Sequence, residues 1–127
     1  MVKTMISMFS NGEFSNDLNL YTTGAAQTEL FNDVAFLRNN HLVMRGGPDN
    51  DPQVTAVNSG ATPQTVTITD CWDTHAWTTV YAADPTTGPV QQTGKPPTQA
   101  VATVTDLSIG WRVTQFTISA STPCAAH

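Results

Sequence analysis

The spacing of apolar residues follows a helical period at the start of the chain. Apolar side chains in the first ten residues are three, one and three positions apart, which places them on one helical face. They are Val2, Met5, Ile6 and Phe9. Asn11-Gly12 is a typical helix end, because glycine tolerates a left-handed backbone. The pattern predicts a short helix over residues 1–10, whose upstream turns we expect to lie outside this sequence.

A second helix is predicted before residue 40. Thr22 or Thr23 can cap it, and an apolar stripe at helical spacing follows. The stripe consists of Ala26, Leu30, Val34 and Leu37. The pattern stops at Asn39-Asn40, and a stripe of this kind needs an apolar partner surface.

From His41 onward the period changes to two, with threonines alternating with apolar residues. Such alternation is typical of strands with one buried and one wet face. Strands are predicted at residues 42–46, 53–58, 64–72, 77–81, 99–107 and 111–119. We expect a long exposed loop at residues 84–97, which are rich in proline, and a flexible tail at residues 120–127.

This order of elements predicts one α+β domain over residues 1–127. Two or three N-terminal helices would pack on a strongly curved antiparallel sheet of about six strands. The helices would cover one sheet face and leave a threonine-rich face in water, with a pocket between helices and sheet.

Charge and composition exclude some functions. The chain has ten acidic and five basic residues, for a net charge of −5, and the basic residues are scattered. Nucleic-acid binding needs clustered Lys and Arg, so we expect none. We also expect no membrane insertion, because no apolar run approaches the roughly 20 residues of a spanning helix.

Cys71 and Cys124 leave two alternatives open. An oxidising compartment would favour a disulfide between them, whereas two unlinked thiols are the other interpretation. Met1 is followed by a mixed polar and apolar stretch without the pattern of a signal peptide.

Three segments together resemble a known superfamily: residues 20–40, the strand end Val66–Asp73, and the closing Gly110–Phe116. They are similar to small actinobacterial proteins of the NTF2-like (SnoaL-like) superfamily, whose fold is a cone. The resemblance covers nearly the whole chain after residue 18. It implies a cone with an internal pocket and slightly favours an exported protein. Because this fold hosts isomerases, cyclases, hydrolases and binding domains, it leaves the function open.

The densest set of reactive groups lies at residues 70–75. Period two places Asp70 on the same strand face as Ile68 and Trp72, where an apolar setting would raise its pKa toward a range useful for a general base. His75 or Tyr81 could assist it. The alternative is that Asp70, at a strand end, bonds turn amides.

A metal site is not expected from the same stretch. Asp70, Asp73 and His75 together with the thiol of Cys71 mix hard and soft ligands in one short segment, which matches no common ligand set. No cofactor motif is present either.

The aromatic residues suggest ligand contacts as well as packing. Trp72 and Trp77 are expected to border a cavity, and the hydroxyls of Tyr21 and Tyr81 could orient a ligand. Because the sequence offers no convincing acid/base or nucleophile set, and because of the family resemblance, we predict a non-catalytic domain that binds an apolar small molecule or a protein partner. The alternative is a cofactor-free isomerase, cyclase or hydrolase with Asp70 as its base. A threonine-rich open sheet face suits a homodimer, whereas its interpretation as a wet face predicts a monomer equally well.

Overall fold

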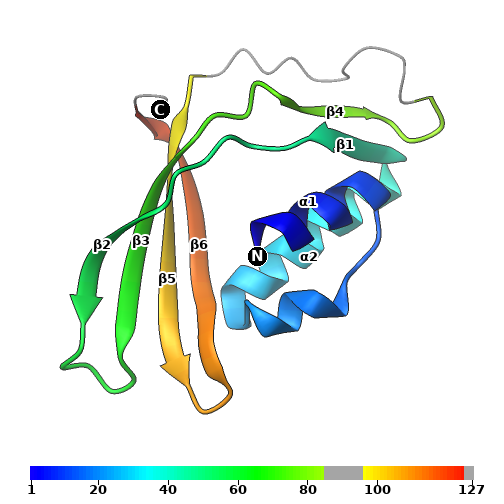
Figure 1. Cartoon of the computed structure of the whole chain (residues 1–127). Helices are drawn as coiled ribbons and strands as arrows, with labels where there is room; N and C mark the ends of the chain where they lie inside the picture. The colour runs from blue at the N-terminus through cyan, green and yellow to red at the C-terminus, as the bar shows by residue number, and fades with distance from the viewer. Residues whose placement is uncertain (85–95, 125–127) are drawn as a thin grey trace.

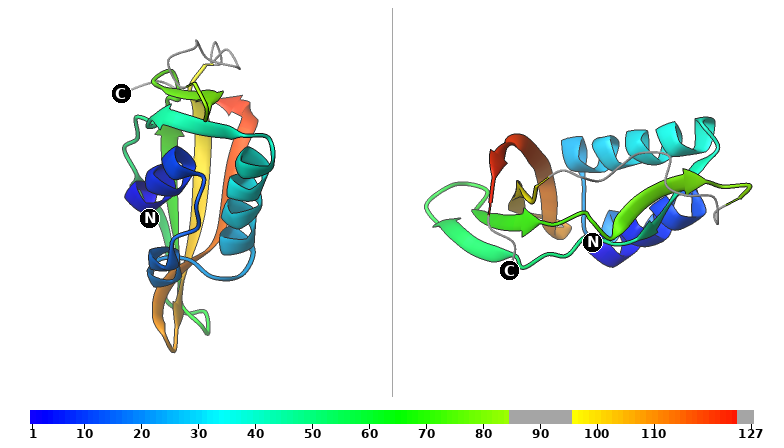
Figure 2. Two further views of the ribbon diagram at one scale, coloured as in Figure 1. Left: turned by 90° about the vertical axis from the view of Figure 1, so that its right-hand side faces the viewer. Right: turned by 90° about the horizontal axis from the view of Figure 1, so that it is seen from above.

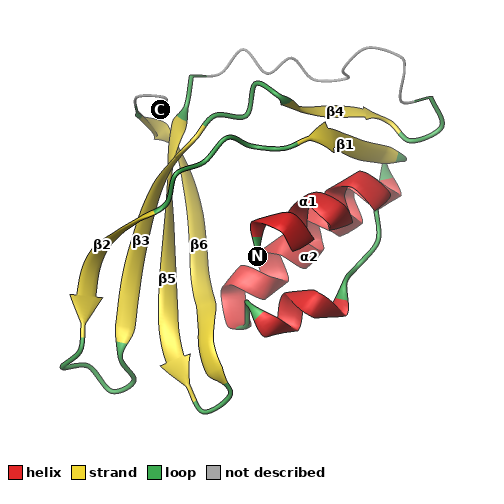
Figure 3. Cartoon of the chain, in the orientation of Figure 1, coloured by secondary structure: helices red, strands yellow, loops and turns green. Residues whose placement is uncertain are grey.

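The computed structural model describes residues 1–84 and 96–124. Two α-helices pack against antiparallel strands, as the sequence predicts (Figure 3). In chain order the helical elements are α1 (Val2–Asn11), the short 3-10 helix η1 (Asn16–Leu20) and α2 (Gly24–Asn39). The strands are β1 (Leu42–Gly46), β2 (Gln53–Asn58), β3 (Thr65–Trp72), β4 (Trp77–Tyr81), β5 (Thr98–Leu107) and β6 (Gly110–Pro123). Most of the predicted loop at residues 84–97 lies outside the described residues.

Both helices end within one residue of the predicted positions. In α1 the buried residues are Met5, Met8 and Phe9, whereas Val2 and Ile6 of the predicted face are only partly buried. Gly12 follows α1 with a φ of 67°, and its N–H donates to the carbonyl of Met8. All four residues of the α2 stripe are buried. Thr23 is the N-cap of α2, but its side chain makes no capping hydrogen bond. No helix in the described part of the chain is long and apolar enough to cross a membrane.

The strands form two sheets, whereas the sequence analysis expects one. β1 pairs with β4, and a four-stranded sheet has the order β2-β3-β5-β6. A bridge between Asp49 and Asp73 joins the two pairings, so residues 42–58 and 65–81 form one long, bent antiparallel ribbon (Figure 1). Pro48 and Pro52 flank the bridge. Proline has no N–H to donate to a ladder, which explains why regular pairing is interrupted there.

β6 continues four residues beyond the predicted end at Ser119. Thr98 pairs with Pro123 after an irregularity in register, and Cys124 donates its N–H to the carbonyl of Pro97 at 3.1 Å. Part of the predicted tail therefore belongs to the sheet, and residues 125–127 lie outside the described range.

The two faces of the four-stranded sheet differ in composition. We call the face that carries Ile68 and Trp72 the inner face and the face that carries Thr67 and Thr69 the outer face. Directly opposed residues of antiparallel strands share a face. The register therefore adds further residues to the inner face, namely Val54, Val57, Val66, Ala102, Val104, Trp111 and Phe116.

The helices cover the inner face only in part. α1 packs on β1, and α2 packs on β6 and β1. Seen from above, both helices lie beside β2 rather than across it (Figure 2). The expected coating of a whole sheet face is therefore limited to the β6 side, and every residue of β2 is exposed.

Candidate functional site

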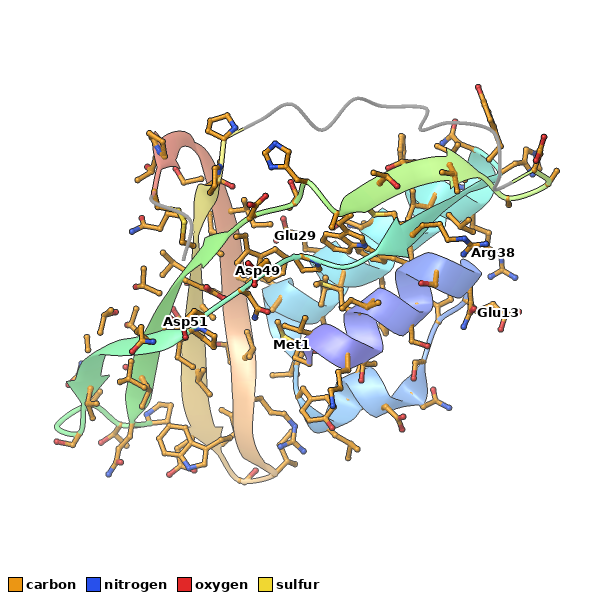
Figure 4. The ribbon with its side chains drawn as sticks, turned by 45° about the horizontal axis from the view of Figure 1, so that its top comes forward. Met1, Glu13, Glu29, Arg38, Asp49 and Asp51 are labelled. Carbon is orange, nitrogen blue, oxygen red and sulfur yellow. A yellow bond between two sulfur atoms is a disulfide. The ribbon has the colours of Figure 1, made fainter. Side chains whose placement is uncertain are left out.

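Two cavities lie where the helices meet the inner face. The first, which we call the sheet cavity, has a volume of about 170 Å³ and an almost wholly apolar lining. Its walls come from the start of α1, the segment before β2 and the inner face, and include Met1, Val2, Pro52, Ile68, Ala102 and Val113. Figure 4 shows Met1 at the end of α1 that is nearest the sheet. The arrangement provides an apolar recess at the sheet's inner face.

The second, which we call the helix cavity, has a volume of about 150 Å³ and lies between α1, α2 and β6. Its lining includes Met5, Phe9, Glu29, Leu30, Asp33 and Trp77. Trp72 and Phe116 line both cavities, and their ring centroids are 5.3 Å apart. This aromatic pair is thus common to the two spaces.

Trp72 and Trp77 border a cavity and also pack in the core. Their side chains are 2% and 6% exposed, and their ring centroids are 6.1 Å apart. Trp77 also stacks on Phe9, with centroids 5.4 Å apart. Each ring therefore contributes buried area and one wall of a possible binding space.

Asp70 lies on the inner face, as period two indicates, and borders the sheet cavity. The residue is 8% exposed, and its carboxylate accepts two hydrogen bonds. The backbone N–H of Asp51 donates to Oδ1 at 2.7 Å, and Trp72 Nε1–H donates to Oδ2 at 3.0 Å. Asp70 therefore fixes both the segment that enters β2 and the orientation of the central indole.

The proposed partners of Asp70 lie elsewhere. His75 is 61% exposed, and its Nδ1 lies 2.7 Å from Oδ1 of Asp73. Tyr81 and Tyr21 are 50% and 42% exposed, and neither is part of the lining of the two cavities. The structure therefore does not bring His75 or either tyrosine hydroxyl to the carboxylate of Asp70.

Glu29 and Asp33 form an acidic pair that the sequence analysis did not single out. They lie four residues apart on α2, and both line the helix cavity. Partial burial, and then the negative charge of Glu29, raises the pKa of Asp33 above its usual value. No ion pair in the described part of the chain involves either carboxylate. The sequence could have indicated this pair by its spacing alone, because residues i and i+4 lie on one helix face and both are next to residues of the apolar stripe.

The indole N–H of Trp77 is a buried donor without a hydrogen-bond partner within residues 1–84 and 96–124. Buried donors of this kind are uncommon in folded proteins, because the lost hydration is not replaced. Trp77 therefore places an unsatisfied hydrogen-bond donor, which costs free energy, next to the helix cavity.

Cys71 and Cys124 form a disulfide, which resolves the two alternatives in favour of the bridge. Their Cα atoms are 5.8 Å apart, within the usual range. The bridge links the end of β3 to the segment after β6, with β5 between these strands in the sheet order. Cys71 is therefore not a thiolate ligand, and the described residues contain no cluster of three or more His, Cys, Asp or Glu that could hold a metal ion.

The geometry allows an apolar ligand to bind in the sheet cavity, beside the hydrogen-bonded carboxylate of Asp70. The neighbouring helix cavity is bordered by the carboxylates of Glu29 and Asp33. The resemblance to the NTF2-like superfamily stays a prediction. Comparisons with protein-family models, with curated proteins and with solved structures found no match to this chain.

Proposed function

We propose that this chain is a non-catalytic domain that binds a small apolar ligand in the sheet cavity. The observation that carries the proposal is an almost wholly apolar recess of about 170 Å³ at the inner face of the sheet. Well-packed interiors contain few voids larger than a water molecule, so a recess of this size is a candidate binding space.

The volume limits the ligand. Cavities of about 150 Å³ with apolar walls hold a benzene-sized molecule. A single ring or a short branched alkyl group would fit the sheet cavity without rearrangement. A longer ligand would need Trp72 and Phe116 to move, because these two side chains border both cavities.

An enzyme with Asp70 as general base is the second candidate, supported by the position of Asp70 beside the sheet cavity. Two features weigh against it. Both carboxylate oxygens already accept hydrogen bonds, which is the usual arrangement of a structural carboxylate. In addition, no second acid or base among the described residues is hydrogen-bonded to Asp70.

The disulfide supports an exported location within this proposal. Structural disulfides persist in oxidising compartments and are rare where thiols are kept reduced. A binding domain exposed to such a compartment would meet ligands outside the cytosol.

A cavity-filling substitution tests the proposal. We expect benzene, titrated into the ¹⁵N-labelled protein, to shift the amide signals of Ile68, Ala102 and Val113. Ala102→Leu fills the sheet cavity from β5 and should abolish these shifts. Ala56→Leu makes the same change on the exposed outer face of β2 and should leave them intact.

Urea denaturation of both variants checks that each remains folded. Shifts that survive in Ala102→Leu, or that map to other residues, would contradict the proposed site. Turnover of any substrate that depends on Asp70 would instead favour the enzyme.

A further inference from the structure

The free edge of β2 has a bulge between Val54 and Ala56 but no charged or proline side chain to protect it. In the part of the chain that the structure describes, β2 pairs with β3 alone, and all six of its residues are exposed. Natural proteins usually guard such an edge with charged side chains, especially lysine, or with proline. β2 contains neither, and residues 52–69 carry no charged side chain at all. The backbone donors and acceptors on this edge are therefore open to another strand.

The inner face adds apolar surface at the same edge. Val54 and Val57 stand opposite Ile68 and Val66, and they are 61% and 66% exposed. Both helices lie beside β2 rather than across it in the view from above (Figure 2). A strand added to β2 would cover part of these two side chains.

The sequence of β2 fits a second copy of itself. Its residues read Gln-Val-Thr-Ala-Val-Asn. The sequence is nearly symmetric about its centre, with Thr-Ala in the middle, a valine on each side and a polar amide residue at each end. An antiparallel pairing centred on Thr55 and Ala56 sets Val54 opposite Val57 of the partner subunit. The same pairing sets Gln53 opposite Asn58 of the partner subunit. Opposed residues share a face, so apolar meets apolar on the inner side of both copies.

Charge opposes a second copy less at this edge than elsewhere on the chain. The chain carries −5 overall, so most contacts between two copies would oppose like charges. The centred pairing avoids this, because Asp51 would then lie opposite uncharged residues near Gly60 of the partner subunit.

We propose that two copies of this chain associate through β2, forming a continuous eight-stranded sheet with its inner faces on the same side. The contact is small, and β2 has a bulge between Val54 and Ala56 that interrupts regular pairing. A stable interface buries about 1,200 Å² or more, so we expect a weak, concentration-dependent dimer.

Sedimentation equilibrium of the disulfide-bonded protein tests the proposal, at concentrations from about 10 μM to about 1 mM, the range in which weak association is measurable. We expect the average mass to rise toward that of a dimer. Val57→Lys should keep the protein monomeric, because it places a charge in the centre of the contact. Phe36→Lys is the matched control, since Phe36 is equally exposed at 63% but lies on α2. It should dimerise like the parent chain.

Amide hydrogen exchange identifies the contact without any substitution. Backbone amides of β2 should exchange more slowly at the high concentration, while those of α2 should not change. A monomer at every concentration, a dimer that persists in Val57→Lys, or added protection only at amides outside β2 would each overturn the proposal. If Val57→Lys fails to fold, the exchange measurement on the parent chain still decides.

Discussion

The inner face of the four-stranded sheet is partly covered at β6, where Trp111 remains 46% exposed, and bare at β2. Near β6, Trp72 and Phe116 contact each other and lie close to both helices. At β2, Val54 and Val57 face solvent on the same side of the same sheet. The strands at both ends alternate in the same way, so alternation alone does not determine burial.

The difference arises from where the helices attach. α1 and α2 pack on β1 and β6, at the two ends of the bent ribbon and sheet, and not on β2 (Figures 1 and 2). An apolar strand face becomes core only where another element lies over it. The covered end should therefore supply most of the stability, and the bare end should be available for contacts.

Substitutions at the two ends should differ most in stability. We expect Trp72→Ala to lower the free energy of unfolding by about 3–5 kcal/mol, because a large buried side chain is lost and a cavity is enlarged. Val57→Ala should change it by less than about 0.5 kcal/mol, as is usual for exposed positions. Urea denaturation measures both. Similar losses for the two variants would mean that the described surface at β2 is covered in solution.

The disulfide joins the end of β3 to the segment after β6. The double substitution Cys71→Ser with Cys124→Ser should lower stability by about 2–4 kcal/mol, because the unfolded chain gains freedom when the loop is opened. The same denaturation experiment with and without reductant gives the value for the parent protein. A parent protein that is equally stable after complete reduction would contradict this expectation.

Asp70 connects the two ends, since it bonds Trp72 on one side and the segment entering β2 on the other. Asp70→Asn should cost about 1–3 kcal/mol, because the amide replaces one acceptor oxygen with a donor and leaves a buried partner unsatisfied. Hydrogen exchange at Asp51 should also become faster. Unchanged exchange at Asp51 would show that the carboxylate does not hold this segment.

We expect the smallest change in stability from a substitution of Asp33, and we expect this change to depend on pH. Its raised pKa means that the charged carboxylate destabilises the folded state above its folded pKa, and that this penalty fades as pH falls through that value. Asp33→Asn should therefore stabilise the protein at pH 7 by about 0.2–0.5 kcal/mol, the range for like charges four residues apart on an exposed helix. Below pH 3.8, the ordinary pKa of an aspartate side chain, the difference should vanish. Glu29→Gln should act in the same direction at pH 7, and a destabilising effect of either variant would refute this account.

Much of the local structure was predictable from the sequence. The change of period after His41, together with turn residues such as Gly46-Gly47-Pro48 and Ser59–Pro63, placed β1, β2 and β4 at the residues where they occur. The α2 stripe named its buried residues correctly. These are short-range properties, because they depend on the periodicity of one segment and on its turn residues.

The missed features depend on contacts between distant segments. The split into two sheets follows from how residues 47–52 meet Asp73, and the limited coverage of the inner face follows from the helix attachment at β1 and β6. The position of Asp70 on the inner face was predictable from period two, but its hydrogen bond to the N–H of Asp51 spans nineteen residues. For Glu29 and Asp33 the sequence shows only that they are four residues apart. That both line a cavity depends on how α2 packs against the other elements.

The bridge between Cys71 and Cys124 also changes how the chain responds to proteases. A single cut anywhere between these residues would leave both fragments covalently joined. The nicked protein would therefore migrate as one species on a non-reducing gel and separate into two fragments only after reduction. In an oxidising, protease-rich environment, the chain would stay in one piece after a break that would divide an unlinked domain.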